Sequence, residues 1–229
     1  IIAAVVIGYF AIMFVSPRLD KTDKLRLLTC FILIIGSTLF WSSFEQQPTS
    51  FNLFADRYTD LNVLGFEIPS IWFQSLNPLF ILLLAPIVSI AWIKLANRGL
   101  EPNRMVKFAL GMLLTAAGFS LMIFASKSIL TSDGALASPL WLVGSLLLLT
   151  LGELALSPVG LSAMTKLAPK GMQGHMMGLF FDSFALGNLV AAFFVCNVSA
   201  GTFGVFPTLF TTMAVLMVVT TVGLLLLAK

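Results

Sequence analysis

Long apolar stretches separated by short polar loops make up nearly the whole sequence. The first stretch has about 15 residues. Each of the other six is long enough, at about 1.5 Å per residue, to cross about 30 Å of hydrocarbon as an α-helix. The seven stretches lie at 1–15, 27–44, 68–93, 108–126, 138–166, 172–198 and 206–228. The sequence lacks the alternating ten-residue segments of a membrane barrel, so the pattern predicts an all-α membrane protein.

The composition strengthens this prediction. Hydrophobic residues make up 59% of the 229 residues, charged residues only 10%, and the mean hydropathy is +1.01, which is too apolar for a soluble domain. The net charge is +3, and the basic residues form short clusters between the apolar stretches, which argues against a nucleic-acid partner. Cys30 and Cys196 lie inside apolar stretches without metal-ligand spacing, so we expect packed small side chains and no metal site.

The loops alternate between those that carry several basic residues and those that carry one. The rich loops are 16–26, 94–107 and 166–175, and the poor loops are 55–67 and 127–137. By the positive-inside rule the rich loops are cytoplasmic, so the last stretch ends in the cytoplasm. The alternation holds for every loop, and this regularity supports the predicted number of helices.

Three acidic residues, Glu45, Glu153 and Asp182, lie within or at the edge of predicted spans. An ionised carboxylate at such a depth costs about 2.5 to 3.5 kcal/mol, so a functional role is the first hypothesis. Glu153 is the strongest candidate, because Pro158 follows on the same helix and is expected to loosen it. The alternatives are a structural ion pair for Glu153, a carboxylate facing water for Glu45, and a helix–helix hydrogen bond for Asp182.

Polar and aromatic side chains of the predicted spans are weaker candidates. Asn77 precedes Pro78, and its amide can either cap carbonyl groups freed by the proline or bind a ligand. Trp41, Phe180 and Phe181 are suited to an apolar pocket, but aromatic residues of membrane helices more often pack against other helices. The pattern alone therefore favours packing for these three rings and leaves Asn77 open.

Four stretches together carry a family resemblance. They are FWSSFEQQPTSFNLFADR (40–57), WFQSLNPLFILLLAP (72–86), GELALSPVGLSAMTKLAP (152–169) and MMGLFFDSFALGN (176–188). In this order they resemble the C-terminal half of a proton-dependent oligopeptide transporter, of the POT branch of the major facilitator superfamily. The resemblance covers nearly the whole chain, and the motifs FEQ, FQSLNP and GELxLSPxGLS are far more specific together than singly.

The resemblance implies a domain organisation. Residues 27–229 would form the C-terminal six-helix bundle, transmembrane helices 7 to 12, and residues 1–26 would hold the end of an extra linker-hairpin helix and a cytoplasmic loop. The chain also starts within an apolar stretch and without methionine, so we expect a fragment of a longer protein. Its partners would be the N-terminal six-helix half and the lipid bilayer, in a bacterial inner membrane that the protein crosses several times.

The resemblance also implies a function, the import of di- and tripeptides with protons as the coupling ion and no other cofactor. By position, Glu153 resembles the glutamate that holds the peptide ammonium, and Asn77 the asparagine that contacts the same end. Glu45 resembles the carboxylate implicated in proton coupling. The remaining positions that correspond to the substrate pocket are Trp41, Phe180, Phe181 and Ser183.

Two positions depart from the family pattern. Phe180 stands where many bacterial members have tryptophan, and Asp182 stands where an apolar residue is expected. These departures leave the pocket size and the side-chain preference open, so a related carrier for nitrate or an amino-acid derivative is an alternative. The sequence has no HExxH or GxSxG motif and no paired intramembrane aspartates, so we do not expect an enzyme. A purely structural subunit would leave Glu45 and Glu153 without a role.

Overall fold

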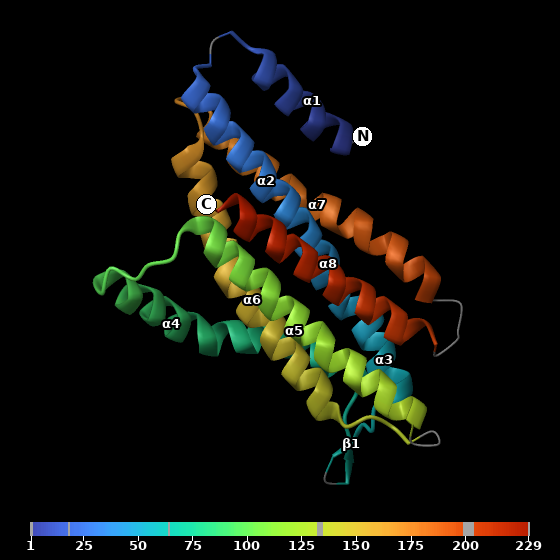
Figure 1. The fold of residues 1–229 in the computed structure, drawn as a ribbon. Helices are drawn as coiled ribbons and strands as arrows, with labels where there is room; N and C mark the ends of the chain where they lie inside the picture. The colour runs from blue at the N-terminus through green and yellow to red at the C-terminus, as the bar shows by residue number, and fades with distance from the viewer. Residues whose placement is uncertain (1, 18, 64, 132–134, 199–203, 229) are drawn as a thin grey trace.

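The protein is described by a computed structural model that covers residues 2–17, 19–63, 65–131, 135–198 and 204–228. Helices dominate these residues (Figure 1). The α-helices are α1 (Ile2–Val15), α2 (Lys21–Phe44), α3 (Asn52–Tyr58), α4 (Leu76–Asn97), α5 (Arg104–Thr131), α6 (Pro139–Leu167), α7 (Gln173–Val198) and α8 (Val205–Leu227). A π-helix, η1 (Gln47–Phe51), precedes α3, and a 3-10 helix, η2 (Ser70–Ser75), precedes α4. A short antiparallel hairpin pairs β1 (Asn62–Val63) with β2 (Phe66–Glu67).

Within the described residues, six helical segments are long and apolar enough to cross a membrane. The predicted all-α class and the six spans are therefore confirmed. The span that begins with α2 extends beyond the apolar stretch 27–44, because it continues through η1 and α3 to Tyr58. The Glu45 backbone N–H still donates to the Trp41 carbonyl at 2.9 Å, four residues back, as in an α-helix, whereas the Gln46 N–H donates to the Ser43 carbonyl at 3.1 Å, only three residues back. Pro48 lies at the start of η1, where a missing N–H removes no helical bond, and the helical path continues.

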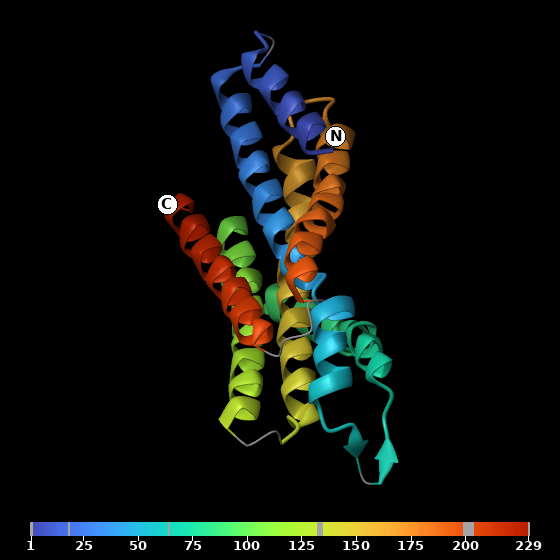
Figure 2. The ribbon, with the colours of Figure 1, turned by 90° about the vertical axis from the view of Figure 1, so that its right-hand side faces the viewer.

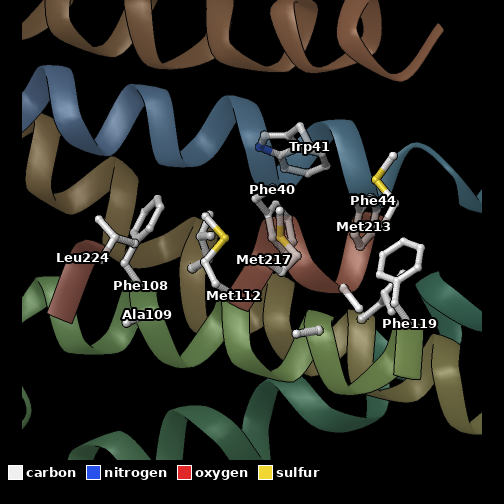
Figure 3. Close-up of a cluster of buried hydrophobic side chains, with 14 of the residues drawn as sticks. Phe40, Trp41, Phe44, Phe108, Ala109, Met112, Phe119, Met213, Met217 and Leu224 are labelled. Atoms are coloured by element: carbon white, nitrogen blue, oxygen red, sulfur yellow. The ribbon is translucent and has the colours of Figure 1, made fainter. Parts of the chain in front are cut away.

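The helices pack in two main groups. α5 lies along both α6 and α8, α2 lies along α7, and α1 contacts α7 near the start of the chain (Figures 1 and 2). α4 leans away from the bundle; it contacts α6, and none of its residues is buried in the described part of the chain. Figure 3 shows part of the core, where Phe40 and Trp41 of α2, Phe108 and Met112 of α5, and Met217 of α8 meet. Cys30 is buried as predicted, and the side chain of Cys196 lies outside the described part.

Two glycines allow helix backbones to approach closely. A Cβ atom at Gly152 of α6 would lie 2.6 Å from the Thr115 Oγ1 atom and 2.7 Å from the Gly111 carbonyl oxygen, both on α5. A Cβ atom at Gly187 of α7 would lie 2.5 Å from the Trp41 Cβ atom on α2. Since real Cβ atoms do not approach so closely, both contacts require glycine. The turn of α6 next to Glu153 is therefore held directly against α5.

Candidate functional site

Glu153 lies near the middle of α6, which continues as an α-helix through Pro158. The helix starts at Ser138, whose hydroxyl accepts a hydrogen bond from the Leu140 backbone N–H at 3.3 Å. Among the described residues, the Glu153 Oε2 atom is buried and has no hydrogen-bond partner, and the same holds for the Ser157 hydroxyl one turn further on. Buried polar atoms are nearly always hydrogen-bonded, so two unpaired acceptors on one face of α6 indicate a place for a ligand or water.

Asn77 and Glu153 come together between α4 and α6. Thr150 of α6 donates to the Asn77 Oδ1 atom at 2.7 Å, and its hydroxyl also lies 2.8 Å from the Leu146 carbonyl oxygen. The Asn77 side chain in turn forms a hydrogen-bond interaction with Glu153. Sequence reasoning missed Thr150. Its position three residues before Glu153, on the same helix face, is a signal that could have identified it.

Glu45 directly follows α2 and is half-buried. It shares a small cavity of about 170 Å³ with Asn77. The other lining residues are Phe44, Gln47, Pro48 and Gln74. The structure thus places Glu45, at the junction of α2 and η1, and Asn77, in the first turn of α4, on the walls of one cavity, although 32 positions separate them in the sequence.

Trp41 and Phe180 are the two candidate rings that are buried. Trp41 is 7% exposed, its ring centroid lies 4.0 Å from that of Phe184, and Figure 3 shows it on α2 beside the core. The Trp41 Nε1 atom is buried and has no partner among the described residues. Phe180 is 2% exposed and lies against Gly160 of α6. Both rings therefore contribute to helix packing in this chain.

Phe181 and Ser183, the other two candidates on α7, have opposite surroundings. Phe181 is 54% exposed, whereas Ser183 is fully buried and donates to the Ser37 hydroxyl on α2 at 2.7 Å. Asp182, between them, is partly exposed. The structure brings Glu153, Asn77 and Glu45 to neighbouring positions, and it places Ser183 in the contact between α2 and α7.

The arrangement around Glu153 is suited to binding a hydrogen-bond donor, and a cationic one above all. An ionised carboxylate can only accept hydrogen bonds, and charge-assisted bonds to ammonium groups are roughly twice as strong as neutral ones. One carboxylate oxygen is buried and unpaired, while the neighbouring amide of Asn77 supplies further polar contact.

Comparison with known protein families shows to which family the chain belongs. The family described as PTR2, the POT family, matches residues 1–209 of the chain. The chain belongs to the POT family. The resemblance inferred from the four motifs is thereby confirmed.

Among POT relatives, the chain is 51% identical over 227 residues to the peptide transporter YePEPT of Yersinia enterocolitica, covering 99% of the chain and 44% of that protein. It is 38% identical over 177 residues to a di-/tripeptide transporter of Lactococcus lactis, covering 76% of the chain and 35% of that protein. The chain thus spans less than half the length of the curated relatives it matches.

Solved POT structures show the same fold. A mutant of the peptide transporter POT in complex with alafosfalin superposes with a TM-score of 0.90 at 36% identity, covering 99% of this chain and 45% of that one. A POT family transporter in complex with 5-aminolevulinic acid superposes with a TM-score of 0.87 at 29% identity, covering 99% and 46%. The chain therefore has the helical fold of a multi-pass POT transporter.

Proposed function

We propose that this chain is the C-terminal half of a proton-coupled symporter that imports di- and tripeptides by alternating access. The observation that carries the proposal is the buried, unpaired Glu153 oxygen beside Asn77, in a chain of the POT family. The names of the relatives support it, because they are peptide or di-/tripeptide transporters. In this proposal residues 27–229 form the C-terminal bundle and residues 1–26 belong to the linker between the two halves.

Glu153 would bind the N-terminal ammonium of the peptide. A zwitterionic peptide loses hydration when it enters a cavity in the membrane, and a charge-assisted hydrogen bond from its ammonium to Glu153 offsets part of that loss. Asn77 would contact the same end of the peptide, and Trp41, Phe180, Phe181 and Ser183 would shape the pocket for its side chains. Recognition of the termini leaves the side chains free, which gives a broad peptide range.

Glu45 would couple transport to protons. If it binds a proton in the outward-open state and releases it in the inward-open state, its protonation shifts the equilibrium between the two conformations. Rocking of the two halves then moves the site from one face of the membrane to the other. The protein would lie in a bacterial inner membrane, and the basic loops support an orientation with the C-terminus of this chain in the cytoplasm. The N-terminal half would complete the site, and no enzymatic step is involved.

A related carrier for an amino-acid derivative or nitrate is the second candidate. Two observations favour keeping it: the departures at Phe180 and Asp182, and the POT relative that was solved with 5-aminolevulinic acid. Both candidates use the same bundle and the same Glu153, so only the solute distinguishes them.

The test is uptake of labelled dialanine by the full-length protein in proteoliposomes with an imposed proton gradient. We expect uptake that collapses when the gradient is abolished, and competition by unlabelled dialanine and trialanine but not by nitrate. Competition by nitrate or by 5-aminolevulinic acid, together with none by trialanine, would assign the protein to the second candidate.

A further inference from the structure

We propose that Thr150 is a positioning residue of the amine-binding site, because its hydroxyl fixes the Asn77 amide with the NH2 group turned toward Glu153. The inference rests on the proposed function and adds a residue to the same site. It starts from the 2.7 Å hydrogen bond between the Thr150 Oγ1 atom and the Asn77 Oδ1 atom, which links two helices across 73 positions of sequence.

The direction of this hydrogen bond follows from counting donors and acceptors. A threonine hydroxyl has one proton, and two acceptors lie near it, the Asn77 Oδ1 atom and the Leu146 carbonyl oxygen. In an α-helix the Leu146 carbonyl already accepts the backbone N–H of Thr150, four residues later. The Asn77 carbonyl oxygen is therefore the acceptor that gains most from the hydroxyl proton.

A fixed Asn77 carbonyl also fixes the other end of the amide. With its oxygen turned to Thr150, the NH2 group is left to interact with Glu153. The reverse orientation would place the amide oxygen beside the carboxylate, and two acceptors without a proton between them repel each other. Thr150 thus keeps a donor on one side of Glu153. The unpaired Oε2 atom remains for the donor that a ligand brings, such as a peptide ammonium.

The surroundings of the two residues explain why such a bond matters here. Thr150 is fully buried, and its helix is held against α5 at Gly152, so the hydroxyl has a well-defined position. Asn77 lies in the first turn of α4, which leans away from the bundle and has no buried residue in the described chain (Figure 1). The closely packed helix α6 therefore positions the Asn77 side chain of the loosely packed helix α4.

The experiment is a double-mutant cycle on the full-length protein, with the Kd for dialanine as readout. We expect T150V to raise the Kd roughly five- to tenfold, the effect of losing one ordinary hydrogen bond, whereas T150S keeps the hydroxyl and stays within about twofold. In the N77A background, T150V should change the Kd by less than about twofold, since the group that Thr150 positions is absent. The Kd for N-acetyl-dialanine, which lacks the ammonium, should not respond to T150V.

Thr220 provides the matched control. Among the described residues its hydroxyl bonds within its own helix alone, to the Leu216 carbonyl at 2.7 Å, so T220V tests the loss of a helical threonine hydroxyl away from the site. We expect its Kd and melting temperature to match those of the unaltered protein. An unchanged Kd in T150V overturns the role of Thr150 and leaves the proposed function intact. The same conclusion follows if T150V raises the Kd by the same factor in the N77A background as in the unaltered protein. Failure of the unaltered protein to bind dialanine overturns both this inference and the proposed function.

Discussion

The two carboxylates of the site, Glu153 and Glu45, differ in their surroundings. Glu153 lies within a continuous helix, with one oxygen beside an amide and the other unpaired. Glu45 lies where α2 ends, half-buried on the wall of a cavity that it shares with Asn77. A buried carboxylate in the middle of a helix is suited to binding a ligand cation. A carboxylate on a cavity wall at a helix junction is suited to gaining and releasing a proton through that cavity.

This difference predicts separable effects for Glu45. In E45Q the side chain keeps its shape and loses its ability to gain and release a proton. We expect dialanine counterflow, which needs no net proton movement, to stay within about threefold of the unaltered protein, the effect of a modest change in local hydrogen bonding. Uptake driven by a pH gradient should fall to the level without a gradient. An intact response to the pH gradient in E45Q would remove Glu45 from the coupling mechanism.

Individual residues were predictable only where their chemistry conflicts with the membrane. Glu153 and Glu45 could be identified because a carboxylate is costly in an apolar stretch. The spacing of Thr150 from Glu153 places it on the same helix face, but it does not predict the bond to Asn77, because that bond depends on how two helices pack. Phe180 and Phe181 are neighbours in sequence, yet one is buried and the other is 54% exposed. A helix that is apolar on all sides does not reveal which of its faces is packed.

At the scale of the helices, the contact between α2 and α7 depends on Gly187. A Cβ atom there would lie 2.5 Å from the Trp41 Cβ atom and 3.0 Å from the Ser42 backbone nitrogen. We expect G187A to destabilise the protein by about 1 to 3 kcal/mol, the usual cost of overpacking, with a lower melting temperature in detergent. G178A on the same helix is the control, since its added Cβ meets nothing within 4 Å. Equal melting temperatures for the two variants would contradict this packing.

An ion pair between Glu101, in the loop that joins α4 to α5, and Lys107, in the first turns of α5, can be tested by a pH titration. Lys107 is buried, its ammonium lies 2.6 Å from the Glu101 Oε1 atom, and it sits 4.8 Å from the centre of the Trp92 ring. The hydrogen bond from Lys107, with its positive charge, lowers the pKa of the exposed Glu101. Because the pKa is lowered on folding, the pair stabilises the protein at neutral pH, and this contribution is lost as the pH falls through the folded pKa of Glu101.

The variant E101Q should therefore melt at a lower temperature than the unaltered protein at pH 7. The difference should shrink as the pH falls below about 4, the ordinary range of a carboxylate pKa, because the folded pKa of Glu101 is lower still. E67Q, on the exposed strand β2, is the control and should leave the melting temperature unchanged at pH 7 and well below pH 4. A difference between E101Q and the unaltered protein that is as large well below pH 4, at about pH 2.5, as at pH 7 would exclude the ion pair as its cause.

Helix positions were largely predictable, because span length and hydrophobicity are properties of the sequence. The ends were less so. The apolar stretch that ends at Phe44 is followed by a local change from α-helix to π-helix, and the span continues to Tyr58. Sequence signals such as Glu45 and Pro48 mark a disturbance of the helix, but they do not distinguish a wider turn from an end, because both lack regular α-helical bonds.

For the whole molecule, the exposed apolar surface indicates which parts need other partners. α4 has no buried residue in the described chain, and large side chains such as Leu82 (73% exposed) and Ile87 (61% exposed) point outward from it. Water cannot solvate such a helix favourably, and in the proposed full-length transporter lipid or the N-terminal half would cover it. The six spans could be predicted from the sequence. The lean of α4 could not, since a helix that is apolar on all sides does not show which face packs or at what angle.

The orientation of the molecule gives a direct prediction. After replacement of the native cysteines, a cysteine at Glu67, beside β1, should react with a membrane-impermeant maleimide in intact cells. A cysteine at Lys170, in the loop before α7, should react only after permeabilisation, because the positive-inside rule predicts that the basic loops are cytoplasmic. Both positions are exposed, so accessibility within the protein does not limit the reaction. The opposite labelling pattern would reverse the proposed topology.

The central claim is that Glu153 binds the ammonium group of a peptide, and the variant E153Q tests it most directly. Glutamine keeps the size and polarity of the side chain and removes the charge. We predict that proton-driven dialanine uptake by the full-length protein in proteoliposomes falls to the background of empty liposomes, while the variant folds and reconstitutes like the unaltered protein, as size-exclusion elution and melting temperature would show. Uptake by E153Q at the rate of the unaltered protein would contradict the account.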